Sequence, residues 1–283
     1  MSNALEARGH DLSDALWSAR LLRDARDEVA AVHRAYYLAG ADVATTASYQ
    51  ASEEGFVRAG VDRAEARRLV ADSVTLAREV RDSLAGDGRA RLVAASVGPY
   101  GAMLADGSEY RGHYGVPRAV LRDFHGPRLE VLTSAGPDLL AVETIPDADE
   151  AAVLVDLLDD MALPAWLSYS VRGHRTRAGQ PLAEAFEVAA AARSVVAVGV
   201  NCCSPDDVLP ALRTAAQVTD LPLVAYPNSG EAWDGVARRW TGAPEFDVGL
   251  APAWVAAGAR YVGGCCRVGP ADIARLAELL RRP

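Results

Sequence analysis

Residues 195–203 read VVAVGVNCC, and residues 261–266 read YVGGCC. Each stretch is a short apolar run that ends in two adjacent cysteines. Together they hold every cysteine of the chain: Cys202, Cys203, Cys265 and Cys266. A short and continuously apolar run is typical of a parallel strand that is buried on both faces. The two stretches therefore predict two buried strands that carry thiols at their carboxyl ends.

The same pattern extends along the whole chain. The expected strands are residues 42–48 (DVATTAS), 92–97 (LVAASV), 139–143 (LLAVE), 165–170 (AWLSYS), 195–201, 223–226 (LVAY) and 261–264. Apolar residues recur at helical spacing between them, over residues 63–84, 148–161, 182–193, 206–218 and 270–281. Alternation of strands and helices predicts an α/β fold with a parallel sheet.

Seven strands are one fewer than a (β/α)8 TIM-type barrel requires. The pattern leaves three possibilities: an open barrel, a doubly wound sheet, or a chain that begins after a strand that its relatives possess. No repeat, low-complexity tract or linker interrupts the sequence. We therefore expect residues 1–283 to form a single domain.

Composition excludes several classes of protein. The net charge is −9 and no long basic run occurs, so nucleic acid is not an expected partner. No apolar run approaches the roughly 18 residues of a membrane span, and no secretory leader is visible, so we expect a cytoplasmic protein. No GxGxxG follows a strand, which argues against a Rossmann-type dehydrogenase. His113, His125 and His174 are expected to be surface histidines.

The cysteines are candidate zinc ligands. Functional groups of a parallel barrel gather at the carboxyl ends of its strands. Cys265 and Cys266 can offer two sulfurs and either Cys202 or Cys203 a third, which leaves the fourth position of a tetrahedral zinc ion open. Such a site favours a thiol substrate, which coordination deprotonates for attack on a methyl group. Buried cysteines that act as small apolar residues, or a redox-active vicinal pair, are the alternatives.

Six stretches resemble the homocysteine S-methyltransferase family, in particular its S-methylmethionine branch: ATTASYQAS, SVGPYGA, AVETIPDADEA, VGVNCC, YPNSGE and GGCC. The resemblance implies a (β/α)8 barrel with one zinc ion bound by Cys202, Cys265 and Cys266, with Cys203 as a neighbour. It also implies that homocysteine takes the fourth position. Its sulfur would accept a methyl group from S-methylmethionine or S-adenosylmethionine, which forms methionine.

The resemblance also implies substrate-binding residues. Glu143 matches the acidic residue that holds the homocysteine ammonium group. Tyr49 resembles an aromatic residue on the donor side, where a ring face attracts a sulfonium. Asn201, Asn228 and Ser229 are expected to contact the substrate or to support the residues that do.

One departure from the family concerns the first strand. Relatives begin with an apolar strand and an Asp-Gly-Gly loop, whereas here SNALEARG follows Met1 directly. We therefore expect a barrel without its first strand, two unpaired strand edges, and a misassigned start codon as the cause. The alternative functions are an impaired barrel that binds zinc and homocysteine without catalysis, and a thiol methyltransferase with another donor such as betaine.

Overall fold

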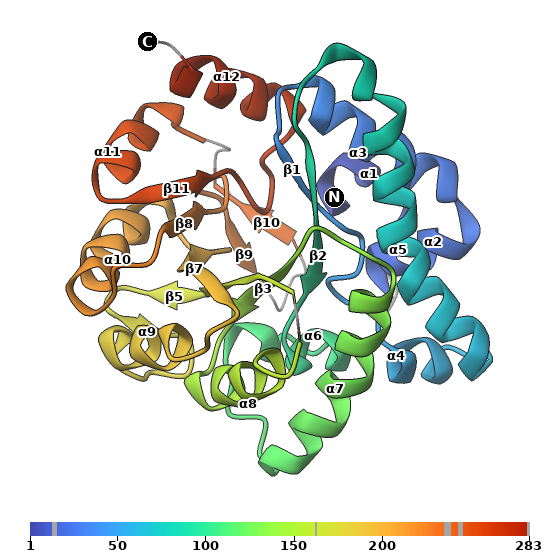
Figure 1. Cartoon of the computed structure of the whole chain (residues 1–283), viewed down its shortest axis with the longest axis horizontal. Helices are drawn as coiled ribbons and strands as arrows, with labels where there is room; N and C mark the ends of the chain where they lie inside the picture. Colours follow the sequence, from blue (N-terminus) through green and yellow to red (C-terminus); the bar gives the residue numbers. More distant parts are fainter. Residues whose placement is uncertain (13–15, 162, 235–238, 243–245, 282–283) are drawn as a thin grey trace.

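The computed structural model describes residues 1–12, 16–161, 163–234, 239–242 and 246–281. Seven parallel strands form one sheet in the order β1-β2-β3-β4-β7-β8-β11. Their bounds are β1 Val43–Thr45, β2 Leu92–Val97, β3 Leu139–Ile145, β4 Ala165–Tyr169, β7 Val195–Asn201, β8 Leu223–Tyr226 and β11 Ala259–Val262. The sheet curls into an open TIM-type barrel with helices around it (Figure 1). The predicted fold class is confirmed, as is the number of its strands.

Helices fill the connections between the strands. They are α1 Ser2–Glu6, α2 Leu21–Asp24, α3 Arg26–Leu38, α4 Glu53–Arg58, α5 Arg63–Ser83, α6 Tyr100–Leu104, α7 Arg118–Ser134, α8 Ala148–Leu158, α9 Leu182–Ala190, α10 Pro205–Val218, α11 Ala251–Ala256 and α12 Pro270–Arg281. Short 3₁₀ turns are η1 Trp17–Arg20, η2 Ala85–Asp87, η3 Ser108–Tyr110 and η4 Val248–Leu250. Two small antiparallel hairpins join β5 Val171–Arg172 to β6 Arg175–Thr176 and β9 Ala232–Asp234 to β10 Arg239–Thr241. Among the described helices, none is long and apolar enough to cross a membrane.

The core lies between the sheet and the surrounding helices. Every residue of β3 is buried, as expected of a central strand covered on both faces. Several helices begin at a polar cap: the side chain of Asp62 accepts from the backbone N–H of Ala64 before α5, and that of Asp147 accepts from Asp149 before α8. These caps satisfy N–H groups that a helix leaves open at its first turn. They fix where each helix starts after a strand.

The barrel is open between β1 and β11, because each of these strands pairs with only one neighbour. The two expected edges are thus confirmed. Helices α3 and α12 contact each other on this open side. The hydroxyl of Tyr36 donates to the carbonyl of Val268 at 2.9 Å, and Arg281 pairs with Asp42 at 2.7 Å. Side-chain contacts therefore tie the two ends of the sheet where backbone pairing does not.

Some predicted bounds differ from the structure. The strand expected at residues 42–48 spans only Val43–Thr45, because the chain leaves the sheet to form the rim. The strand expected at residues 261–264 spans Ala259–Val262, and its pairing with β8 shifts register at the unpaired Arg260. The strand expected at residues 139–143 continues to Ile145. Helix α7 was not predicted, because Gly126 and Pro127 interrupt its pattern.

Candidate metal and substrate site

Three cysteines converge at the carboxyl ends of the strands. The sulfur atoms of Cys202, Cys265 and Cys266 all lie within 4.8 Å of one another, and those of Cys202 and Cys266 are 3.6 Å apart. Sulfur ligands of a tetrahedral zinc ion lie about 3.8 Å apart, given a Zn–S distance of about 2.3 Å. Cys203 is outside this cluster and is fully buried in the apolar core. The three thiols have the chemistry and spacing of a zinc site.

Two glycines in the cysteine motifs allow the backbones to approach each other. A Cβ on Gly199 in β7 would lie 1.9 Å from the carbonyl oxygen of Val224 in β8. A Cβ on Gly264 would lie 2.2 Å from a methyl group of Val268. Neither distance is possible for a real side chain. Glycine at these two positions therefore lets Cys202 and the Cys265–Cys266 loop meet.

Backbone hydrogen bonds fix the loop that carries Cys265 and Cys266. The N–H of Cys265 donates to the carbonyl of Pro227 at 2.7 Å, and the N–H of Cys266 donates to the side-chain oxygen of Asn228 at 3.2 Å. The N–H of Ser229 donates to the carbonyl of Cys266 at 3.0 Å. Asn228 and Ser229, predicted as substrate-binding or supporting residues, thus contact the cysteine loop.

The three thiols share their protons. Hydrogen bonds from Cys265 and Cys266 lower the pKa of Cys202, and a nearby Arg177 lowers it further. The hydrogen bond with Cys202 raises the pKa of Cys265 and of Cys266, and burial adds to both shifts. Without a metal ion, the thiolate form is therefore favoured at Cys202 over Cys265 and Cys266. Metal binding has to displace the remaining protons, which couples it to pH.

Glu143 is a buried carboxyl in β3, with 8% of its surface exposed. The hydroxyl of Ser96 donates a hydrogen bond to it. Burial raises the pKa of Glu143 to about 6, although hydrogen bonds from Ser96 and Tyr226 oppose the shift. A carboxylate held this way would gain from a cationic partner.

Asn201, the last residue of β7, is fully buried and links three elements. Its side-chain oxygen accepts from the N–H of Thr144 at 2.6 Å and from the hydroxyl of Ser168 at 2.8 Å. Its amide nitrogen donates to the Thr144 hydroxyl at 2.7 Å and lies 4.0 Å from the sulfur of Cys265. In this arrangement Asn201 orients the rim beside the cysteines.

Tyr49 follows β1 and reaches the same rim. A hydrogen bond with Thr144 opposes a rise in its pKa that comes mainly from burial, with Glu109, Cys202 and Cys265 adding electrostatically. The phenol group of Tyr49 is thus within electrostatic range of Cys202 and Cys265. The structure brings together Tyr49, Glu143, Asn201 and the cysteines at one end of the barrel.

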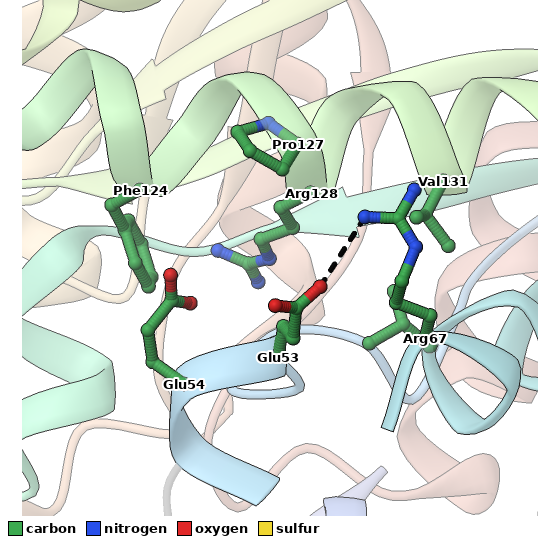
Figure 2. Close-up of a pocket in the computed structure, with 8 residues that line it drawn as sticks. Glu53, Glu54, Arg67, Phe124, Pro127, Arg128 and Val131 are labelled. Carbon is green, nitrogen blue, oxygen red and sulfur yellow. Dashed lines mark hydrogen bonds and ion pairs between the residues drawn. The ribbon is translucent and has the colours of Figure 1, made fainter. Parts of the chain in front are cut away.

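Arg128 in α7 holds the backbone around Tyr49 although it binds no carboxylate directly. Its guanidinium donates to the carbonyls of Ser48 at 2.6 Å, Tyr49 at 2.7 Å and Gly98 at 2.8 Å. It also lies over the ring of Phe124. Figure 2 shows this arginine in a hollow between α4, α5 and α7. Burial lowers its pKa to about 10.

One prediction about histidines is wrong. His125 is fully buried, and its Nε2 lies 2.9 Å from the carboxylate of Glu150, whereas His113 and His174 are exposed as expected. Glu150 also accepts a hydrogen bond from the hydroxyl of Tyr114 at 2.9 Å. His125 lies on the inner face of α7, the helix that sequence periodicity did not reveal.

The structure adds two residues to the site. The hydroxyl of Tyr110 lies 3.5 Å from the sulfur of Cys202, and the Arg177 guanidinium lies over the Tyr110 ring at 5.8 Å. Tyr110 belongs to a turn and Arg177 follows a hairpin strand, so neither occupies the end of a predicted strand. The sequence contains no periodic signal for them.

The fold and the cysteine cluster define a class of protein: an α/β barrel with a metal site of three thiols at its carboxyl rim. The chain matches the family described as "Homocysteine S-methyltransferase" over residues 1–280. It belongs to this family.

Known relatives agree with this assignment. A homocysteine S-methyltransferase of Escherichia coli (strain K12) is 47% identical over 286 residues, which cover 98% of this chain and 92% of that protein. Homocysteine S-methyltransferase 1 of Arabidopsis thaliana is 43% identical, over 98% of this chain and 90% of the relative. The crystal structure of the metallated homocysteine methyltransferase MmuM from Escherichia coli is similar, with a TM-score of 0.90, 43% identity, and coverage of 99% of this chain and 93% of that one.

Proposed function

We propose that this protein transfers a methyl group from a sulfonium donor, S-methylmethionine, to homocysteine and so forms methionine. The three sulfurs within 4.8 Å of one another carry this proposal, because they can bind zinc and leave one position for a substrate thiol. Zinc, when bound there, supplies the charge that keeps a coordinated thiol deprotonated at neutral pH.

Each proposed role follows from the surroundings of the residue. Cys202, Cys265 and Cys266 would hold the metal. Glu143 would bind the homocysteine ammonium group, because it is a buried carboxyl whose hydrogen-bond donors among the described residues are the neutral hydroxyls of Ser96 and Tyr226. Tyr49 would face the sulfonium with its ring, while Asn201, Asn228 and Ser229 keep the rim and the cysteine loop in place.

The transfer step balances without a further reactant. Zinc held by Cys202, Cys265 and Cys266 would lower the pKa of the homocysteine thiol, whose proton would pass to solvent. A lone pair on the sulfur forms the new S–C bond to the methyl carbon, and the S–C bond of the sulfonium breaks with its electron pair staying on the donor sulfur. The donor thus becomes a neutral thioether. With S-methylmethionine both products are methionine.

The test is methionine formation by the zinc-loaded protein. Homocysteine is offered with S-methylmethionine, S-adenosylmethionine or betaine, and a Cys202→Ala protein serves as the control. We expect S-methylmethionine to give the highest rate and the control to give none. Methyl transfer from betaine alone would assign a different donor, and zinc binding without any transfer would indicate a binding protein.

A further inference from the structure

Glu109 in η3 is a buried carboxyl that no described residue neutralises. Only 5% of its surface is exposed, and its Oε2 atom has no hydrogen-bond partner among the described residues. An unpaired buried carboxylate is costly, so proteins rarely retain one without a use. Its carboxyl has a hydrogen bond with its own backbone, but the free Oε2 atom and the lack of a cationic partner among the described residues point to a ligand.

The position of Glu109 places it beside the reacting groups. Its neighbour Tyr110 contacts the Cys202 sulfur at 3.5 Å. The charge of Glu109 raises the pKa of Tyr49, and the charge of Cys202 raises the pKa of Glu109, so the carboxyl is electrostatically coupled to both. Glu109 thus lies on the rim that holds the cysteines and the proposed donor aromatic.

The nearby arginines Arg111 and Arg177 have other partners and form no ion pair with the Glu109 carboxylate among the described residues. Arg111 pairs with Asp106 at 3.7 Å at the surface, and its lowering effect on the pKa of Glu109 is smaller than the raising effect of Asp106. Arg177 donates to the hydroxyl of Ser170 at 3.2 Å. Burial raises the pKa of Glu109 to about 7, which is typical of a carboxyl that lacks a positive partner.

We propose that Glu109 binds the cationic methyl donor, and that it is the residue that selects a positively charged donor. This proposal rests on the proposed function, in which two amino acids meet at the cysteines. Glu143 lies near the carboxyl end of β3 and Glu109 lies in the turn after α6, so each buried carboxyl would serve the cation of one substrate. A charge-assisted contact of this kind also orients the sulfonium methyl group.

The experiment compares Glu109→Gln, which removes the charge and keeps the size, with Asp106→Asn. Asp106 is a matched control, because its exposed carboxyl lies in the same loop and caps the N–H of Ser108 as an Asn also can. We expect KM for S-methylmethionine to rise about 10- to 100-fold in Glu109→Gln, the range for loss of a charged hydrogen bond. KM for homocysteine should change less than about twofold, as should both values in Asp106→Asn.

Calorimetry on the zinc-loaded protein separates this proposal from the function on which it rests. S-methylmethionine and neutral methionine are titrated into wild type and Glu109→Gln. The wild type should prefer the sulfonium, and the variant should lose that preference. If the wild type catalyses no transfer but shows this pattern, the proposed function fails and the role of Glu109 stands.

Three outcomes would overturn the role of Glu109. One is an unchanged donor KM in Glu109→Gln with an active wild type. Another is an equal rise of both KM values, which indicates general damage. The third is loss of zinc from both Glu109→Gln and Glu109→Asp, which would make Glu109 a structural residue. Retention of zinc and of part of the donor affinity by Glu109→Asp supports a role for charge.

Discussion

Two adjacent cysteines, Cys202 and Cys203, have opposite surroundings. Cys202 directly follows strand β7 with a φ of 51°, in the left-handed region, and its sulfur joins the cluster. Cys203 is fully buried among apolar side chains, and burial raises the pKa of its thiol. The first residue therefore has the surroundings of a ligand, and the second those of a small apolar residue.

This contrast predicts different results for the same substitution. Cys202→Ala should lose most of the bound zinc, because two sulfurs remain where three are needed. Cys203→Ala should keep about one zinc per chain and lose about 1 kcal/mol of stability from the small cavity. Metal analysis and denaturant unfolding of the two proteins measure both effects. Equal zinc loss in the two variants would contradict the assignment of ligands.

The pKa of Glu143 predicts an acid limb in catalysis. The carboxyl is charged above about pH 6 and takes up a proton below it, so its attraction for the homocysteine ammonium group is lost as pH falls. We expect kcat/KM for homocysteine to decline about tenfold per unit below that pH. In Glu143→Gln this dependence should be absent and KM for homocysteine raised. A limb that persists in the variant belongs to another group.

At the residue scale, the sequence shows what lies at strand ends and little else. Cys202, Cys265 and Glu143 follow or end apolar runs, so their convergence could be predicted from the geometry of parallel sheets. Glu109, Tyr110 and the buried His125 occupy a turn and an interrupted helix. Their burial depends on tertiary packing, which has no period in the sequence.

At the scale of elements, the predicted bounds were correct for three inner strands but missed the end of the fully buried β3. The bounds of β2, β7 and β8 match the predicted runs, because strands covered on both faces need continuous apolar sequence. The edge strands β1 and β11 deviate, because one side of each has no partner to define the end. The small hairpins β5–β6 and β9–β10 have too few residues for a recognisable pattern.

The close contact between β7 and β8 predicts that adding one methyl group at Gly199 destabilises the sheet. Gly199→Ala would force a Cβ against the carbonyl of Val224, so the strands must separate or shift. We expect a loss of about 1–3 kcal/mol in stability, as for overpacking, together with weaker zinc binding because β7 positions Cys202. Unfolding and zinc titration measure the two effects. As a comparison, Val196→Ala at an exposed position of the same strand should change neither by much.

At the scale of the whole molecule, the metal site connects an inner strand to an edge. Cys202 follows β7, whereas Cys265 and Cys266 follow β11, and β8 lies between these strands. A ligand that binds only the folded state stabilises it, by about 2.7 kcal/mol at a hundredfold excess over Kd. Zinc should therefore stabilise the edge of the barrel as well as its rim.

Removal of the metal tests this connection. A chelator should lower Tm, and amide hydrogen exchange should accelerate in residues 259–266 more than in β3, which is buried throughout. Exchange followed by mass spectrometry with and without zinc measures the difference. Uniform acceleration across the sheet, or none at β11, would show that the site does not hold the edge.

Because the cysteine pair follows an edge strand, activity depends on whether that strand is folded. When β11 frays, Cys265 and Cys266 move away from Cys202. The three-thiol site that would activate the methyl acceptor is then lost. Catalytic activity is therefore lost at an early stage of unfolding, while most of the sheet is still intact. The activity of a sample is therefore proportional to the number of molecules in which β11 is still paired with β8.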